Sequence, residues 1–485
     1  MKLLPGFGLA VALAGQAAFL DVSAAQAPAR QPLDRSAAPK PGPPPKLKLP
    51  AVEKRTLSNG LPVWIVELHE VPVVHASLVM KAGSGADPRS QFGIAHLTAE
   101  MLDEGAGARD ALQIADGIDY LGASLSTSST SDAAFVDLHV PVARLGDALP
   151  IMADVALRPT FPEKELQRVR EELLTSIIQA QDDPDELIKF AFPRIVFGPQ
   201  HRYGTMAFGT AASLKSFTVA NLRQFHASHY VPPNATLIVT GDVTPASVVA
   251  QLESAFGAWK GTAPALTPVP QAPQLTARKV YLIDKPGAAQ SQIRIGWVGV
   301  PRSTPDFFAL RVLNTVLGGA FTSRLNQNLR EEHGYAYGAG SSFDMRGSAG
   351  PFYSAAAVQT DKTSEALREF FKELDAIRTP IPAAELEKAK NYLALLLPRN
   401  FETTQSLAGS LAQLFVYNLP ADYYATFTDR VRAVTPADAQ RAAERNLQPD
   451  KFAVVVVGDL KAIEPGIRAL NLGPVTIVTI EEVLK

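Results

Sequence analysis

The chain has 485 residues, which is too long for a single hydrophobic core and predicts two or more domains. Its 46% hydrophobic and 19% charged residues are typical of a globular protein and exclude a disordered or fibrous chain. The formal net charge of -2 gives no electrostatic reason to expect a nucleic acid or an anionic membrane as partner. The chain has no cysteine, which excludes disulfides and thiolate metal sites.

Residues 1–27 have the pattern of a secretory signal peptide. Lys2 precedes an apolar run over residues 9–14, and small residues at 25–27 form a plausible cleavage site. The alternative is an uncleaved membrane anchor, but glycines interrupt the run and no second long apolar stretch follows. We therefore expect an exported protein, periplasmic or secreted, with no membrane partner after cleavage.

Residues 28–50 contain eight prolines and predict an extended tether rather than part of a fold. From residue 51 onward, landmarks recur at nearly one spacing. Pro382 lies 220 positions after Pro162, and Gly458 lies 217 positions after Gly241. This recurrence predicts a duplicated domain. We expect homologous domains at residues 51–263 and 277–485, joined by a proline-rich linker at 264–276.

Each half begins with strand patterns and continues with helical ones. Residues 64–66 and 75–80 are rich in β-branched and aromatic side chains, which favours strands. A helix is expected to begin at Pro162, because apolar side chains follow at helical spacing as far as Ile178. Neighbouring strands followed by several helices predict an α+β fold, with helices packed on one face of an antiparallel-rich sheet in each domain.

A helical segment at residues 93–101 is close to a known metal-binding pattern. In an H-x-x-E-H helix, two imidazoles four residues apart bind one zinc, and the Glu is the general base for the metal-bound water. In this chain His96 stands at the first ligand position, Ala99 at the base position and Glu100 at the second ligand position. The residues around the motif match the pattern, but the general base and the second histidine ligand are replaced.

Seven segments in chain order carry a resemblance to a known family: 57–61, 93–96, 161–162, 201–204, 230–234, 323–325 and 329–337. With the duplication, they make the chain resemble the pitrilysin and mitochondrial-processing-peptidase family of inverted-motif zinc peptidases over about residues 51–470. The resemblance implies a third zinc ligand, a Glu on the long helix of the first half. Aligning that helix by its end at residues 182–184, or by the family spacing from Glu100, puts Ser176 at this position.

Only His96 therefore remains of the base and three ligands, and we expect this chain to bind no zinc and to lack hydrolytic activity alone. One alternative is that His96 and Glu100 still bind a metal with help from Glu104. The other is that His96 is a helix residue hydrogen-bonded within its own domain. Two or three mismatched donors without a general base do not form a hydrolytic site, which favours the second interpretation.

The resemblance also implies a substrate-binding pair in the second half. Family peptidases use an Arg and a Tyr seven residues apart to hold the substrate carbonyl, and Arg330 and Tyr337 match this pair. Guanidinium and phenol groups can donate hydrogen bonds to a peptide carbonyl and to the oxyanion formed from it. Taken alone, Arg330 could equally be an ion-pair residue and Tyr337 a half-buried strand residue. Arg324 is interpreted as structural.

In the bacterial heterodimeric branch of this family, one subunit carries the zinc motif and the other the Arg/Tyr pair, around an internal chamber. The resemblance thus implies a non-catalytic subunit that forms half of the chamber and assists a homologous zinc-bearing partner in cleaving unfolded peptides. The alternatives are a peptide-binding or scaffold protein without a catalytic role, and an active metallopeptidase with an atypical metal site. Peptides are expected to bind by adding a strand to an exposed sheet edge.

Overall fold

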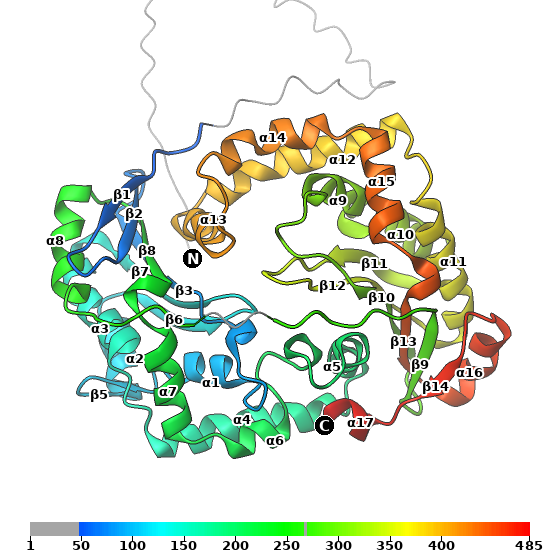
Figure 1. The fold of residues 1–485 in the computed structure, drawn as a ribbon, viewed down its shortest axis with the longest axis horizontal. Coiled ribbons are helices and arrows are strands. Elements are labelled where there is room, and N and C mark those ends of the chain that lie inside the picture. Colours follow the sequence, from blue (N-terminus) through cyan, green and yellow to red (C-terminus); the bar gives the residue numbers. More distant parts are fainter. Residues whose placement is uncertain (1–47, 266–268) are drawn as a thin grey trace, which may run out of the picture. The chain divides into compact units, whose positions relative to one another are not determined.

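The computed structural model of the chain describes residues 48–265 and 269–485 (Figure 1). The expected signal peptide at 1–27 and nearly all of the expected tether at 28–50 lie outside these residues. None of the helices in the described ranges is long and apolar enough to cross a membrane.

Strands and helices of the first half alternate along residues 53–256. The strands are β1 (Glu53–Thr56), β2 (Pro62–Glu67), β3 (Val73–Met80), β4 (Gly105–Ala106), β5 (Arg109–Asp110), β6 (Ser124–Ser129), β7 (Ala134–Pro141) and β8 (Ala235–Gly241). The helices are α1 (Ile94–Glu100), α2 (Ala111–Tyr120), α3 (Leu145–Leu157), α4 (Glu163–Ala180), α5 (Pro184–Phe197), α6 (Ala211–Ser216), α7 (Val219–His229) and α8 (Pro245–Phe256). Helix α4 follows Pro162, as its sequence predicts.

The second half covers residues 279–484. Its strands are β9 (Lys279–Asp284), β10 (Gln290–Val298), β11 (Ala336–Phe343), β12 (Pro351–Gln359), β13 (Ala453–Gly458) and β14 (Val475–Ile477). Its helices are α9 (Phe307–Asn314), α10 (Arg324–Asn326), α11 (Thr363–Ala376), α12 (Ala383–Leu396), α13 (Thr404–Val416), α14 (Tyr423–Ala433), α15 (Pro436–Asn446), α16 (Leu460–Ala469) and α17 (Ile480–Leu484). Two π-helical turns, Thr315–Gly319 and Gln327–Glu332, flank α10.

The two large sheets of the described residues share one topology. The first has the strand order β1-β2-β8-β3-β7-β6, and the second has the order β11-β12-β10-β13-β9-β14. Strands β2-β8-β3-β7-β6 thus correspond to β9-β13-β10-β12-β11. In each set the first pair is parallel and the other pairs are antiparallel. The predicted α+β class, with two homologous domains and antiparallel-rich sheets, is confirmed.

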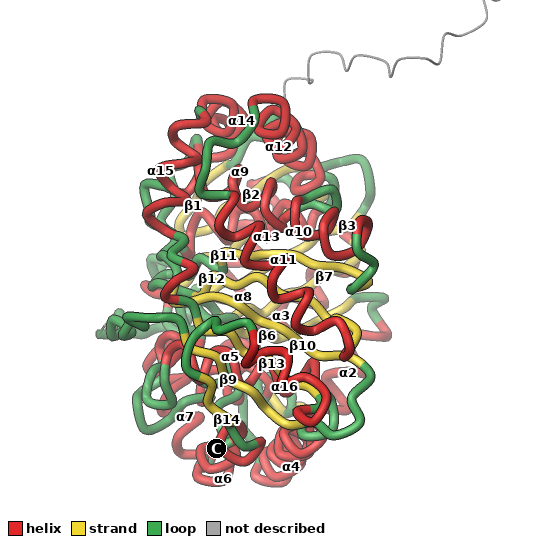
Figure 2. The backbone as a smooth tube through the Cα atoms, turned by 90° about the vertical axis from the view of Figure 1, so that its right-hand side faces the viewer, coloured by secondary structure: helices red, strands yellow, loops and turns green. Residues whose placement is uncertain are grey.

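The central strands of both sheets are buried on both faces. Every residue of β8 and of β13 is buried, and both strands are continuous apolar runs apart from two threonines in β8. A strand that is covered on two faces loses the alternation of apolar and polar residues seen in a half-exposed strand. Figure 2 shows the strands in yellow between helices in red.

The cover on the second face of each sheet comes from the other half of the chain. Helix α5 of the first half packs against β10 and β13, and helix α13 of the second half packs against β8 and β3. Accordingly, Val79 and Ile238 of the first sheet belong to the hydrophobic cluster of the second half, whereas Val455 and Val457 belong to that of the first. The sequence did not predict this exchange of helices.

We expect Phe192→Ala to lower the stability of both halves together. Phe192, on α5, is 1% exposed, and its ring lies 5.9 Å from that of Tyr353 on β12. Removing a buried phenylalanine costs about 3–5 kcal/mol, because the cavity is only partly refilled. Denaturant unfolding gives the loss of free energy, and hydrogen exchange of β8 and β13 locates it. Leu112→Ala, at a site 75% exposed, is the control. Loss of protection confined to one sheet would contradict the shared core.

Candidate functional site

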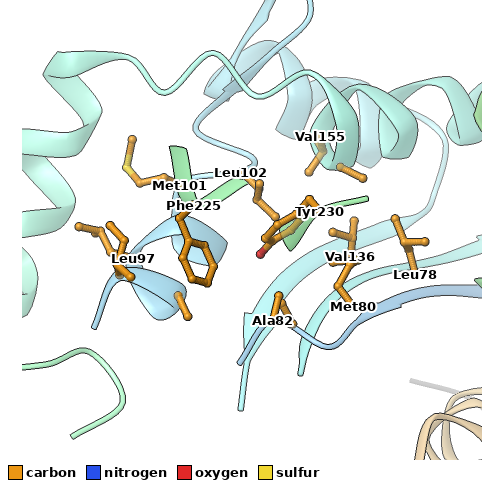
Figure 3. Packing of buried hydrophobic residues seen from close by; sticks show 14 of the residues in the cluster. Leu78, Met80, Ala82, Leu97, Met101, Leu102, Val136, Val155, Phe225 and Tyr230 are labelled. Carbon is orange, nitrogen blue, oxygen red and sulfur yellow. The ribbon is translucent and has the colours of Figure 1, made fainter. Parts of the chain in front are cut away.

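Helix α1 is fixed in place by its first residues and by its apolar face. Gly93 precedes it with a φ of 102°, and a Cβ there would lie 2.2 Å from the carbonyl oxygen of Phe208, so only glycine fits. The side-chain oxygens of Asp87 accept hydrogen bonds from the amides of Gly93 at 2.7 Å and Ala95 at 3.0 Å. Figure 3 shows Leu97 of α1 beside Phe225 of α7 in the core.

His96 is held within its own domain. Its Nδ1 lies 3.4 Å from the hydroxyl of Ser129 on β6, and its Nε2 lies 3.9 Å from Oε1 of Glu100. The ring also packs against that of Phe208, with 6.1 Å between the ring centroids. Burial lowers the pKa of His96, which favours the neutral imidazole near pH 7. This arrangement matches the interpretation of His96 as a hydrogen-bonded helix residue.

The other positions of the zinc motif offer no set of ligands. Ala99 is fully buried, and the Ser176 hydroxyl donates to the carbonyl of Leu173 in its own helix at 2.8 Å. Glu104 is engaged by Arg168 on α4, with 2.5 Å between Oε1 and the guanidinium. Within residues 48–265 and 269–485, no group of three or more His, Asp or Glu side chains could hold a metal ion. These residues do not fit a hydrolytic zinc centre.

Burial raises the pKa of two carboxyl groups near the end of α1. It raises the pKa of Glu100, and the nearby charges of Asp103 and Glu104 raise it further. Burial is also the main cause of the raised pKa of Asp103. A carboxyl with a raised pKa is a poorer ligand for a cation, because protonation competes with metal binding. Protonation of Glu100 and Asp103 therefore competes with cation binding at a higher pH than it does for an exposed carboxyl.

Arg330 and Tyr337, the predicted substrate-binding pair of the second half, lie close together in space. Arg330 lies in the π-helical turn Gln327–Glu332, and Tyr337 lies at the start of β11, next to a shift of register between residues 336 and 339. The guanidinium carbon of Arg330 is 5.3 Å from the centre of the Tyr337 ring. It is also 4.5 Å from the centre of the Phe321 ring. Such cation–π contacts hold a guanidinium in place without using its hydrogen-bond donors.

This cluster of Phe321, Arg330 and Tyr337 is open to solvent. Tyr337 is 87% exposed and Phe321 is 65% exposed, which is unusual for large aromatic side chains in a monomer. Arg330 is engaged by a carboxylate only loosely, with 3.5 Å between its Nε and Glu331. The donors of Arg330 and the phenol of Tyr337 can therefore reach a ligand outside the chain. Phe321 carried no sequence signal.

Arg324 is a structural residue, in agreement with its interpretation from the sequence. Its Nε and Nη2 donate to the two carboxylate oxygens of Glu385 at 2.8 and 2.6 Å. This bidentate pair joins α10 to the first turn of α12.

The edge strand beside Arg330 and Tyr337 differs from the edge strand beside His96. Strand β11 is an edge strand, but Asn326 accepts from the amide of Ala339 and Asn314 donates to the carbonyl of Ser341, each at 3.1 Å. Strand β6 is the edge of the first sheet and lies against α1. In the described part of the chain, no side chain hydrogen-bonds to the backbone of β6. The open edge is therefore the one beside His96.

Two family models match consecutive parts of the chain. The model described as "Insulinase (Peptidase family M16)" matches residues 63–201, and the one described as "Peptidase M16 inactive domain" matches residues 216–393. Together they cover more than half of the sequence.

Two bacterial proteins described as uncharacterized zinc proteases are similar to this chain over most of their length. The uncharacterized zinc protease YmxG of Bacillus subtilis is 27% identical over 360 residues, which are 73% of this chain and 86% of YmxG. The uncharacterized zinc protease SCO5738 of Streptomyces coelicolor is 26% identical over 430 residues, covering 84% of this chain and 90% of the relative.

Solved structures agree with the fold. The crystal structure of a peptidase M16 inactive domain from Pseudomonas fluorescens has a TM-score of 0.77 and 28% identity, and covers 84% of this chain and 98% of its own. The crystal structure of a protease from Helicobacter pylori has a TM-score of 0.77 and 22% identity, and the match covers 84% of this chain and 100% of that protease. At this identity the similarity supports the fold only.

We expect Asp87 to make stability depend on pH. Burial raises the pKa of its carboxyl to about 8, although hydrogen bonds from Gly93 and Ala95 and the charge of Arg202 lower it. Because the folded chain then binds the proton more tightly than the unfolded chain, stability decreases as pH rises from about 4 to about 8. Asp87→Asn removes this part of the pH dependence.

Urea unfolding at pH 5 and pH 8 measures the effect as the difference between the two free energies of unfolding. Asp116→Asn, at an exposed position on α2, is the control and leaves the difference unchanged. An Asp87→Asn variant with the same pH dependence as the native chain would contradict the assignment.

Proposed function

The chain belongs to peptidase family M16, and we propose that it is the non-catalytic subunit of a heterodimeric, exported zinc metallopeptidase that cleaves peptides. In this proposal the zinc and the general base belong to a homologous partner subunit, and this chain binds no metal. It contributes Arg330 and Tyr337 to the partner's active site, together with half of the chamber around the substrate. Export rests on residues 1–27 and is part of the proposal.

The observation that carries the proposal is the contrast between the two halves. The first half has lost the donors of the zinc motif, and its remaining His96 and Glu104 interact with Ser129 and Arg168. The second half holds the partly exposed Arg330 against the two exposed aromatic rings of Phe321 and Tyr337. The two aromatic rings beside Arg330 are exposed and therefore contribute little hydrophobic stabilisation to the fold. Folding stability alone does not explain why these side chains are aromatic, whereas a binding role does.

The chemistry of Arg330 and Tyr337 suits the carbonyl of a scissile peptide bond. Both side chains donate hydrogen bonds, and both strengthen them as negative charge develops on the carbonyl oxygen. The ring of Phe321 fixes the guanidinium in advance, so that less side-chain entropy is lost when substrate binds. Hydrolysis itself takes place on the partner subunit.

The open edge of β6 supports a peptide substrate. An extended peptide can pair with the free backbone groups of an edge strand, which gives affinity without strict sequence preference. The side chains of β6 are serines, a threonine and one leucine, and alternate residues of the strand are exposed. On β11 the amides of Asn314 and Asn326 already occupy backbone groups, which favours β6 as the edge for the peptide.

We expect the purified chain to hydrolyse no peptide and to contain far less than one zinc per molecule. The reason is that no described cluster of ligands fits the metal and Ala99 cannot act as a base. A quenched fluorescent peptide assay with and without chelator, and elemental analysis after dialysis, measure the two quantities. Chelator-sensitive cleavage by the chain alone would support the alternative of an active enzyme and contradict the proposal.

We expect Arg330→Gln and Tyr337→Phe each to lower kcat of the assembled peptidase by about 10²–10³-fold, the usual effect of losing one donor to a developing oxyanion. The assay mixes the chain with a homologous subunit that carries an intact H-x-x-E-H motif. Matched controls are Arg432→Gln and Tyr120→Phe, at exposed positions away from the cluster. Full activity of the double variant in an intact complex would favour the scaffold alternative.

A further inference from the structure

A cavity outside the α1 region and the Arg330 cluster lies where the two halves of the chain meet. A cavity of about 490 Å³ is lined by α9, α13 and α14 of the second half and by the β6–β7 turn and β7 of the first. This volume is within the range of small-molecule sites, about 300–1,000 Å³. Phe321, Arg330 and Tyr337 do not line it. The inference below therefore does not depend on the proposed function.

The cavity holds two positive charges and no negative one. Arg302 and Arg311 line it, and the described lining contains neither aspartate nor glutamate. Asp306, which lies between the two arginines in the sequence, is engaged by Arg445 and Asn446, each at 3.0 Å. Two guanidinium groups that line one cavity repel each other.

Arg302 is fixed as part of the wall. It is 8% exposed, and its guanidinium carbon lies 3.6 Å from the centre of the Phe307 ring. Its Nη2 donates to the hydroxyl of Tyr423 at 2.7 Å. Stacking and one hydrogen bond hold its plane but leave other donors of the guanidinium without a carboxylate.

Arg311 is the unpaired member. Its side chain is exposed, and no hydrogen bond or ion pair joins its guanidinium to any residue in the described ranges. Burial lowers the pKa of Arg311; Tyr423 opposes this shift, and the neighbouring charge of Arg302 adds to it. Arg311 is one of the residues that line the cavity.

The rest of the lining is largely apolar and aromatic. It includes Phe343, Val416, Tyr424 and Phe427, with Asn400 and Gln413 as further polar groups. Such a wall accepts an apolar body, while the two guanidinium groups accept a carboxylate by forked hydrogen bonds. A ligand that carries both features satisfies the charges of the cavity and fills its apolar part.

We propose that this cavity binds the carboxylate of a ligand with an aromatic or aliphatic body, with Arg311 and Arg302 as the anion-binding residues. Two sources share this chemistry, the C-terminal carboxylate of a peptide and a free organic acid. Since residues of both halves line the cavity, the bound ligand also stabilises their contact.

Isothermal titration calorimetry of the full chain tests the site with N-acetyl-phenylalanine and its amide, and with a hexapeptide ending in Phe as acid and as amide. We expect each acid to bind at least about tenfold more tightly than its amide, because the amide lacks the charge-assisted hydrogen bonds. A hexapeptide that binds more tightly than the acylated amino acid identifies a peptide terminus as the ligand. Equal affinities identify a small acid.

Arg311→Gln is expected to weaken binding of the acids about tenfold or more, and Arg311→Lys, which keeps the charge without the fork, is expected to weaken it less. Arg432→Gln, at an exposed position on α14 outside the cavity, leaves the affinity unchanged. Since Arg311 has no partner to lose, the melting temperature of Arg311→Gln without ligand stays at or above that of the native chain.

Three results would overturn the proposal: acids and amides bind equally, Arg311→Gln binds as the native chain does, or no acid binds at millimolar concentration. Inorganic sulfate is the probe for a site that accepts any anion. If sulfate binds as tightly as N-acetyl-phenylalanine, the aromatic lining has no part in recognition, and the proposal is equally wrong.

Discussion

The exchange of α5 and α13 between the halves is the constraint on which the structure depends. A central strand such as β8 or β13 is apolar on both faces, and its own half supplies helices for only one of them. The second face is buried by a helix that the chain delivers from the other half. Each sheet therefore has one face buried by the other half, and residues 48–265 and 269–485 belong to one compact unit.

The same arrangement produces the polar contacts where the halves meet. Asp132 follows β6 and accepts hydrogen bonds from the amide of Gly347, after β11, and from the hydroxyl of Tyr417, at the end of α13. Burial raises the pKa of Asp132, and these bonds oppose the rise by favouring the carboxylate. The cavity with Arg302 and Arg311 lies next to Tyr417. Residues that are far apart in sequence thus form one junction.

The two candidate sites follow from different physical causes. At α1 the helix is fixed by Gly93 and Asp87, and Ser176 and Glu104 are engaged by neighbouring groups. At Arg330 a π-helical turn and an irregular strand start bring the guanidinium close to the rings of Phe321 and Tyr337. Widened helical turns of this kind are frequent at functional sites, because they re-aim side chains.

The sequence alone determined the duplicated α+β fold, the start of α4, the degenerate motif and the spacing of Arg330 and Tyr337, because each depends on residue type and local periodicity. Only the tertiary structure decided the exchange of helices, the place of Phe321 beside Arg330, the open edge of β6 and the charged cavity. These features join residues from distant segments, and their contacts are set by packing between elements. No local pattern records which strand face a helix from the other half will cover.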